Sequence, residues 1–226
     1  MAVKNLSDIA AIEAVPLIER GLPESTYAAL AASAKRTPDR TALTFFLSAE
    51  RLDETHVWTY AELIADVTRA ANLFASLGIA ADRPLAFVLP NLPETHFTIW
   101  GGEAAGAALA INPMLEPKQI ADLMRSARAS VLVALAPALN AQAWPALAAK
   151  LASLPDLKAI AFVDMADYLV EGLRQAARAS IQAAASGLSL KVVNFRDAIR
   201  EQPSDHLVTR REIRGAEVSS YVCTGG

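Results

Sequence analysis

The sequence is poor in the residues that mark several classes of protein. Cys223 is the single cysteine among 226 residues, which excludes an internal disulfide framework and favours a reducing, cytoplasmic location. The formal net charge is only −3, so no strong electrostatic field attracts nucleic acid or an anionic membrane. We therefore expect partners that are recognised locally, and no nucleic acid among them.

Segments that direct a chain to or across a membrane are also missing. The first residues carry Lys4 and Asp8 where a signal peptide would have an apolar core. The most apolar stretch, 127–149, is interrupted by Arg128 and Pro137, whereas a spanning helix needs about 20 consecutive, mostly apolar residues. The sequence predicts neither export nor a membrane span.

What the sequence does contain is a repeating pattern of short apolar runs and amphipathic stretches. From Trp58 onward, this alternation is typical of parallel strands joined by crossover helices. The expected strands comprise residues 85–89, 108–111, 131–135, 157–163, 190–193 and 218–223. The expected helices follow Thr59 and Asn91 and cover residues 117–127, 144–151 and 166–186. The predicted fold class is α/β, a layered and mostly parallel sheet flanked by helices.

A small α+β segment precedes this pattern. It is expected to hold a helix at residues 26–36 and two paired strands at 41–47 and 56–58. No internal repeat or low-complexity linker divides the chain. We predict an N-terminal leader at residues 1–24 and one α/β unit at residues 25–226.

Local signals indicate where two of the helices begin and end. Thr59 and Glu62 have the spacing of a capping box, and Gly78 is expected to end that helix. For the next helix, Asn91 is the expected N-cap and Pro93 lies in the first turn, where proline is tolerated. That second helix is expected to begin directly after a buried strand.

Residues able to carry chemistry are few and scattered. His56, His96 and His206 are far apart, and none has a cysteine or carboxylate at metal-ligand spacing. We predict no metal site and assign the histidines structural or surface roles. Cys223 has no visible base near it, so we interpret it as a small buried apolar residue of a strand, not a nucleophile. No catalytic residue is predicted.

The glycines do not form a known phosphate-binding fingerprint. Gly-x-x-x-x-Gly-Lys-Ser/Thr is absent, and Gly101, Gly102 and Gly106 lie within a predicted helix at the wrong spacing for a dinucleotide site. Glycine inside a helix costs roughly 1 kcal/mol relative to alanine. We therefore interpret these three glycines as points where the backbone approaches a neighbour closely.

The arginines have ordinary interpretations. Arg210, Arg211 and Arg214 precede the last strand and could meet a phosphate, but a solvated connecting loop is the favoured interpretation. Arg174 and Arg178 are expected on the exposed side of the alanine-rich helix. No arginine is assigned to a site.

The last three residues follow a predicted strand. Thr224, Gly225 and Gly226 bring a hydroxyl and unshielded backbone N–H groups to the edge of a sheet, where such groups can hold phosphate oxygens. Thr-Gly-Gly is also an ordinary turn sequence. From these residues alone both interpretations stay open.

Five stretches together form a more specific pattern. They are Trp-Thr-Tyr-Ala-Glu-Leu (58–63), Ala-Asn-Leu-Phe-Ala-Ser-Leu-Gly-Ile (71–79), Phe-Val-Leu-Pro-Asn-Leu-Pro-Glu (87–94), Trp-Gly-Gly-Glu-Ala-Ala-Gly-Ala (100–107) and Ile-Asn-Pro-Met-Leu (111–115). In order and spacing they resemble the N-terminal portion of AMP-forming acyl-CoA synthetases, whose superfamily includes luciferases and peptide-synthetase adenylation domains. In that family an apolar strand leads into Thr-Ser/Gly-Gly-Thr-Thr-Gly-x-Pro-Lys, a loop around the ATP phosphates. Residues 221–226 resemble the first third of that motif.

The resemblance implies a function for the complete protein. It implies that Thr224, Gly225 and Gly226 contact phosphate, and that the chain is a fragment cut within the nucleotide loop. The complete enzyme would use ATP, Mg²⁺ and coenzyme A to convert a carboxylic acid, for instance a fatty acid, to acyl-AMP and then to a thioester. The family's adenine motif, hinge and catalytic lysine lie beyond Gly226. A fragment without the rest of the large domain and the C-terminal domain is expected to be inactive.

Two alternatives belong to other classes. A stand-alone α/β binding or interaction module could assemble with a partner chain through its sheet edge. A nicotinamide-dependent oxidoreductase is disfavoured, because no predicted strand is followed by the glycine fingerprint of such folds.

Overall fold

The computed structural model describes residues 3–223, apart from the side chains of Leu17 and Ile18. Its helices are α1 (Leu6–Glu13), α2 (Thr26–Arg36), α3 (Tyr60–Ser76), α4 (Pro93–Ala105), α5 (Pro117–Ser126), α6 (Trp144–Leu151), α7 (Glu171–Gly187) and α8 (Phe195–Arg200), with three short 3₁₀ turns, η1 (Leu17–Arg20), η2 (Ala49–Arg51) and η3 (Pro137–Asn140). Its strands are β1 (Thr41–Phe45), β2 (His56–Thr59), β3 (Leu85–Val88), β4 (Ala108–Ala110), β5 (Val131–Leu135), β6 (Ala159–Val163), β7 (Lys191–Asn194) and β8 (Ser220–Val222).

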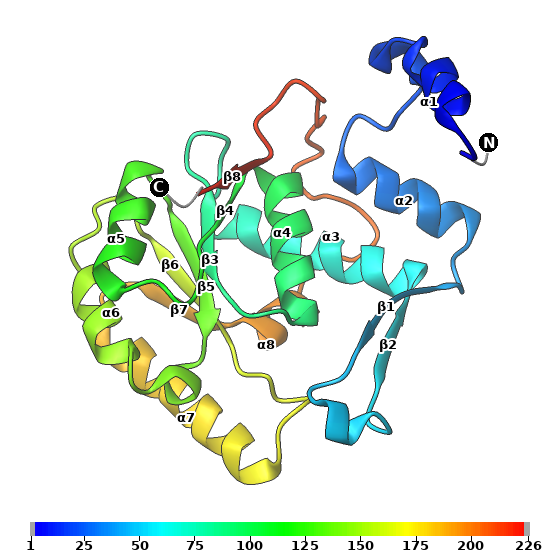
Figure 1. Ribbon diagram of the computed structural model, residues 1–226. Coiled ribbons are helices and arrows are strands. Elements are labelled where there is room, and N and C mark those ends of the chain that lie inside the picture. Colours follow the sequence, from blue (N-terminus) through cyan, green and yellow to red (C-terminus); the bar gives the residue numbers. More distant parts are fainter. Residues whose placement is uncertain (1–2, 224–226) are drawn as a thin grey trace.

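Six of the strands form one parallel sheet in the order β7-β6-β5-β3-β4-β8, and β1 pairs with β2 as a separate antiparallel hairpin (Figure 1). Helices cover both faces of the large sheet. The predicted α/β class is confirmed, and each predicted strand overlaps an observed one.

The two faces of the sheet bury alternate residues of each strand. In β5, Val131 and Val133 pack in the core cluster that includes side chains of α3, α4 and α8. Leu132 and Ala134 belong to the opposite cluster, with α5, α6 and α7. Strands buried on both faces read as continuous apolar runs, which is why they were predictable from the sequence.

The close approach predicted for the glycines of α4 is confirmed. A methyl group on Gly101 would lie 2.9 Å from both Ala70 Cβ and Ala71 N on α3. On Gly102 it would lie 2.3 Å from Leu85 Cδ2 in β3. These glycines let α4 pack directly on a neighbouring helix and on the sheet.

The predicted caps are right for α3 and wrong for α4. Thr59 and Glu62 form the expected capping box, and Gly78 follows α3 with a left-handed φ of 93°. The N-cap of α4 is Leu92, not Asn91. The ring of Pro93 keeps the preceding residue extended, and Leu92 has φ −135° and ψ 161°. The helix therefore begins one residue later than the Asn91 cap would require.

The alanine-rich helix α7 begins at Glu171, five residues after the predicted start at Ala166. The Asp164 carboxylate accepts a hydrogen bond from Ala166 N at 3.0 Å, and Met165 has a left-handed φ of 54°. This local turn holds the chain out of a helix in spite of its composition. Helices α1 and α8 were not predicted.

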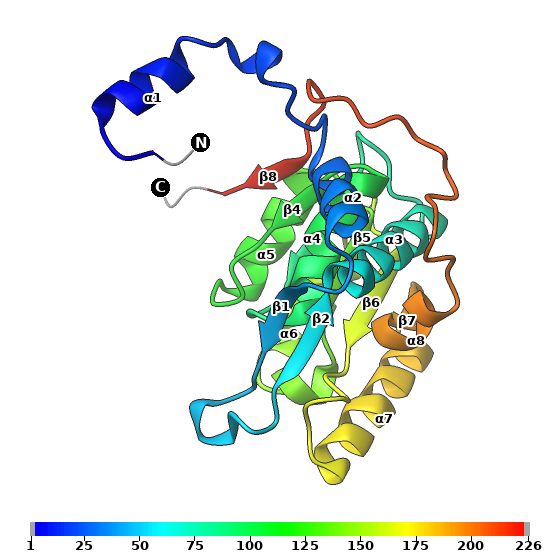
Figure 2. The ribbon, with the colours of Figure 1, turned by 90° about the vertical axis from the view of Figure 1, so that its right-hand side faces the viewer.

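The N-terminal segment stands apart from the sheet, and none of the described side chains of α1 is buried (Figure 2).

The strands β7 and β8 form the two edges of the large sheet. Within residues 3–223, no helix is both long and apolar enough to cross a membrane.

Candidate functional site

The connections that leave the carboxyl ends of β3 and β4 pass to opposite faces of the sheet. The connection after β3 leads to α4 on one face, and the connection after β4 leads to α5 on the other. In open parallel sheets, ligands bind at the carboxyl ends of the strands beside such a switch point. This edge of β3, β4 and the neighbouring β8 is the candidate site.

The strand β8 brings the end of the described chain to this edge. It pairs with β4 in parallel, with Tyr221 opposite Leu109 and Val222 opposite Ala110. The predicted phosphate contacts Thr224, Gly225 and Gly226 follow directly in the sequence but lie outside the described residues. Their predicted role therefore stays a prediction.

The connection after β4 is held in place by its own hydrogen bonds. Asn112 Oδ1 accepts from Met114 N at 2.9 Å, and Asn112 O accepts from Leu115 N at 3.2 Å. Glu116 and Gln119 then form a capping box at the start of α5. These hydrogen bonds order the loop after β4, and the Met114 side chain in it is 86% exposed.

A buried ionic network lies at the same edge of the sheet, where β3, β6 and β7 end. Glu94 in the first turn of α4 is only 3% exposed, and its Oε1 accepts hydrogen bonds from Tyr168 Oη and Arg196 Nη1, each at 3.2 Å. Arg196 also pairs with Asp167. The network connects the start of α4, the loop after β6 and the start of α8.

Glu94 is incompletely satisfied in this network, because its Oε2 is buried without a hydrogen-bond partner among the described residues. Burial raises the pKa of Glu94, and the nearby Arg196 opposes that rise. Burial also raises the pKa of Tyr168, so its hydroxyl remains a donor to Glu94. Sequence reasoning missed these residues. The one available signal was a glutamate in the first turn of a helix, beside a buried strand.

A second buried carboxylate nearby is fully satisfied. Asp164 follows β6 and is 2% exposed. Its Oδ2 accepts from Asn194 Nδ2 at 2.8 Å and Arg178 Nε at 3.2 Å, while Oδ1 accepts from Ala166 N. The prediction that Arg178 lies on an exposed face is therefore incomplete, because its guanidinium also pairs with the buried carboxylate of Asp164.

Two other sequence interpretations are corrected by the structure. Cys223 is exposed, not buried, because it follows a marginal strand whose residues are all exposed. Arg211 is not in a solvated loop. It is 20% exposed, donates to the last carbonyls of α4, including Ala104 O at 3.3 Å, and pairs with Glu217.

The three histidines lie apart from one another. His56 packs against the Tyr168 ring at 4.9 Å, His96 contacts Leu92 O at 3.0 Å, and His206 pairs with Asp205 on the surface. In the part of the chain that the structure describes, no group of three His, Cys, Asp or Glu side chains could hold a metal ion.

Comparison with known proteins identifies the family. Residues 30–208, more than half of the chain, match the family described as AMP-binding enzyme. The chain belongs to this family. This agrees with the resemblance seen in its sequence motifs.

Similar AMP-binding enzymes among curated proteins are coenzyme A ligases. The chain is 28% identical to marinolic acid–CoA ligase of Pseudoalteromonas sp. over 225 residues, which cover 99% of this chain and 31% of that protein. It is 38% identical to crotonobetaine/carnitine–CoA ligase of Salmonella arizonae over 100 residues, 44% of this chain and 19% of that protein. The chain thus spans a third or less of the length of these relatives.

Two solved structures illustrate proteins of similar fold. An acyl-CoA synthetase of Brucella canis has a TM-score of 0.65 at 19% identity, covering 96% of this chain and 36% of that one. The adenylation domain of a carboxylate reductase from Mycobacterium chelonae has a TM-score of 0.70 at 15% identity, covering 92% and 33%. At these identities the likeness supports the fold.

Proposed function

We propose that this chain forms the N-terminal part of an AMP-forming acid–thiol ligase, an acyl-CoA synthetase. The observation that carries the proposal is the match of residues 30–208 to the AMP-binding enzyme family. Three of the similar curated proteins are each named as a CoA ligase. The chain covers 31% of marinolic acid–CoA ligase, so it corresponds to part of such an enzyme. We propose residues 1–24 as a leader and 25–226 as one α/β subdomain.

The proposed reaction has two steps. A carboxylate oxygen attacks the α-phosphorus of ATP, the bond to the bridging oxygen breaks, and pyrophosphate leaves. The sulfur of coenzyme A then attacks the acyl carbon, the carbon–oxygen bond to AMP breaks, and AMP leaves as the thioester forms. Adenylation is needed because an unactivated carboxylate offers no good leaving group, and charge that develops on the phosphates must be stabilised.

Within this chain, Thr224, Gly225 and Gly226 are the proposed phosphate contacts. Glycines without a Cβ allow the backbone to approach a ligand closely, and backbone N–H groups can donate to phosphate oxygens. Among residues 3–223, no group of three His, Cys, Asp or Glu side chains could hold Mg²⁺. We expect it to arrive bound to ATP.

The substrate is proposed only as a carboxylic acid. The relatives are named for marinolic acid, for crotonobetaine and carnitine, and for long-chain fatty acids, so their names do not converge on one acid. Fatty acids of several chain lengths are the first class to test. We place the enzyme in the cytoplasm.

The test is exchange of labelled pyrophosphate into ATP by the full-length gene product that contains this chain. We expect exchange that depends on an added carboxylic acid. The 226-residue chain alone should show no exchange and at best millimolar affinity for ATP, because three loop residues supply few donors. Absence of exchange by the full-length protein with every acid tested would refute the ligase assignment. Tight ATP binding by the isolated chain would refute its predicted inactivity.

A second candidate, an α/β interaction module without catalysis, is favoured by one observation. The outer edge of β8 is unpaired within the described sheet, and exposed strand edges are templates for pairing with another chain. The two candidates differ in the codons that follow Gly226. The ligase requires Thr-Thr-Gly-x-Pro-Lys there, and the module does not.

A further inference from the structure

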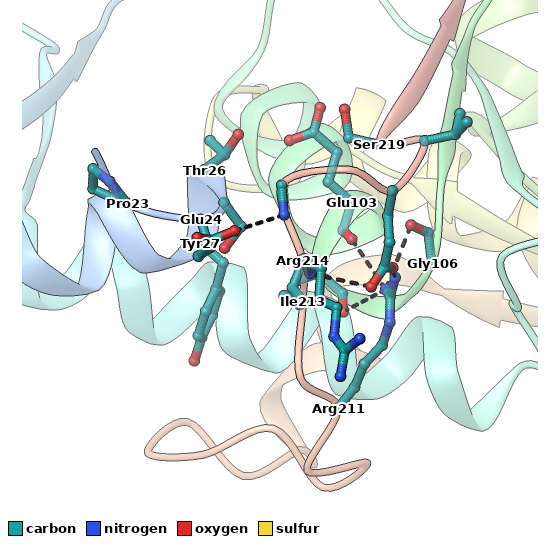
Figure 3. A pocket seen from close by; sticks show the side chains of 15 residues that line it. Pro23, Glu24, Thr26, Tyr27, Glu103, Gly106, Arg211, Ile213, Arg214 and Ser219 are labelled. Carbon is teal, nitrogen blue, oxygen red and sulfur yellow. Dashed lines mark hydrogen bonds and ion pairs between the residues drawn. The ribbon is translucent and has the colours of Figure 1, made fainter. Parts of the chain in front are cut away.

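Two pockets of the chain are each lined by a pair of arginines, and they differ in what those arginines contact. In the pocket of Figure 3, beside the start of β8, Arg211 pairs with Glu217, and Arg214 pairs with Glu212, whose side chain is 79% exposed. Carboxylates of the protein therefore already balance both guanidinium groups there. The second pocket has no carboxylate in its lining, as far as the described residues form it.

The second pocket lies where the end of α2, the start of β1 and the start of α3 meet. Its volume is about 360 Å³, which falls in the range of roughly 300–1,000 Å³ that is typical of ligand pockets. Every residue of its lining has a side chain that can donate hydrogen bonds. These residues are Ser33, Arg36, Thr37, Arg40, Thr41 and Tyr60.

Backbone hydrogen bonds hold together the segments that carry these side chains. Tyr60 N donates to Arg40 O at 3.0 Å, and Ala61 N donates to Pro38 O at 3.1 Å. Arg40 N donates to Thr37 O at 3.3 Å. The main chain thus fixes the positions of the pocket residues, and replacing an arginine side chain leaves these bonds in place.

The two arginines of this pocket have no counter-charge. Within residues 3–223, no ion pair includes Arg36 or Arg40. Arg36 Nη2 donates to Ser33 Oγ at a long 3.5 Å. The neighbouring acids Asp39 and Glu62 are outside the lining, and Glu62 is engaged in the capping box of α3. Two positive charges therefore share one pocket that the described residues leave unbalanced.

A phosphate group matches this arrangement better than a carboxylate does. The planar guanidinium of arginine fits the oxygens of a phosphate with two parallel hydrogen bonds. A phosphate monoester carries about −1.5 to −2 charges at pH 7, close to the two charges of Arg36 and Arg40, whereas a carboxylate carries one. The first N–H groups of α3 already donate to backbone carbonyls, so side chains must supply the donors.

We propose that the pocket between α2, β1 and α3 binds a phosphate group of a small molecule. The guanidinium groups of Arg36 and Arg40 donate to its oxygens, and the hydroxyls of Thr41 and Tyr60 add further donors. None of the six lining residues belongs to β3, β4 or β8, whose ends form the candidate nucleotide edge. The pocket is therefore a separate site, and it does not depend on the proposed ligase function.

The test follows the amide NMR spectrum of the 226-residue chain during titration, without ATP. The probes are inorganic phosphate, pyrophosphate and methyl phosphate, and acetate at equal ionic strength is the control anion. We expect saturable shifts of the Thr37 and Thr41 amides with the phosphates and none with acetate. The probe that binds most tightly identifies the source of the group as free phosphate, a diphosphate or a phosphate ester.

Substitutions assign the binding to the two arginines. Arg36→Gln and Arg40→Gln should each raise the Kd for the tightest probe at least tenfold, which corresponds to about 1.4 kcal/mol. The matched control is Lys35→Gln, which removes an exposed positive charge from the same turn of α2 but outside the pocket lining. This control should bind as the wild type does.

Thermal unfolding provides a second readout, because a ligand that binds the folded state raises Tm. Phosphate also stabilises proteins by exclusion from their surface, so the rise in Tm must be larger in the wild type than in the Arg36→Gln/Arg40→Gln double variant. Should a variant fail to fold, the comparison of phosphates with acetate on the wild type decides. No saturable shift, equal shifts with acetate, unchanged affinity in both arginine variants, or an equal loss in Lys35→Gln would each overturn the proposal.

Discussion

β6 and β8 are parallel strands of one sheet, yet every residue of β6 is buried and every residue of β8 is exposed. Helices α6 and α7 cover one face around β6, and α8 covers the other. Around β8, Tyr221 is 40% exposed and Val222 is 74% exposed. The sheet is covered around β5 and β6 and open at its β8 margin.

Buried carboxylates do not follow this division. On the covered side, each oxygen of Asp164 accepts a hydrogen bond, whereas Glu94 Oε2 has no partner among the described residues. All residues of β6 are buried, so the covered region should control stability. The open region is where ligands, or further chain, are expected to bind.

Truncating a large side chain should give the largest difference in the free energy of unfolding between the two regions. Phe162 in β6 is fully buried and packs edge-on against Trp144 with ring centroids 5.1 Å apart. Phe162→Ala should lower the free energy of unfolding by about 3–5 kcal/mol. Tyr221→Ala in β8 should change it by no more than about 0.5 kcal/mol. Urea denaturation measures both, and equal losses would show that β8 is packed as tightly as β6.

Adding a side chain tests the contact between α3 and α4. Gly101→Val places atoms where the α3 backbone already lies 2.9 Å from a single methyl position, so we expect a loss of about 1–3 kcal/mol. Gly172→Ala is the matched control in α7, since nothing lies within 4 Å of its added methyl group. The control should stabilise the protein by up to about 1 kcal/mol. A neutral Gly101→Val would mean that the two helices do not touch there.

The buried network at Glu94 predicts a dependence of stability on pH. Because the pKa of Glu94 is raised in the folded state, the folded protein binds this proton more tightly than the unfolded chain. Stability from this group is therefore greatest below its ordinary pKa and decreases as pH rises towards the folded pKa. Glu94→Gln should remove that part of the pH slope in urea unfolding, while Glu212→Gln should leave it unchanged. An unaltered slope in Glu94→Gln would contradict the assignment.

The smallest effect is expected at Cys223, which is exposed beside β8. Its alkylation rate with iodoacetamide in the native protein should be within about threefold of the rate in urea, because folding does not shield it. A native alkylation rate that is slower by a much larger factor would mean that Cys223 and the β8 edge are shielded in solution.

Features carried by contiguous residues were predictable from the sequence. The run Val131–Leu135 was predicted with the observed bounds, since a strand buried on both faces has no polar interruption. The capping box at Thr59 was visible because its two partners are three residues apart. The packing role of Gly101 followed from the cost of glycine within a helix.

Features made by residues distant in the sequence were not predictable. Glu94 meets Tyr168 and Arg196 across separations of 74 and 102 residues, and no local pattern reports such a contact. The role of Arg211 depends on the end of α4, more than a hundred residues earlier. Of the candidate site, the sequence indicated the strand and the Thr-Gly-Gly that follows it, but not the buried network at Glu94.

The proposed ligase chemistry is tested most directly by the fate of the carboxylate oxygens. The full-length protein is incubated with ATP, coenzyme A and an acid substrate whose two carboxylate oxygens are ¹⁸O, and the products are analysed by mass spectrometry. The attacking oxygen stays on phosphorus when the thiol breaks the acyl carbon–oxygen bond, so one ¹⁸O should appear in each AMP. Unlabelled AMP, or ADP with the label in inorganic phosphate, would contradict the proposed function.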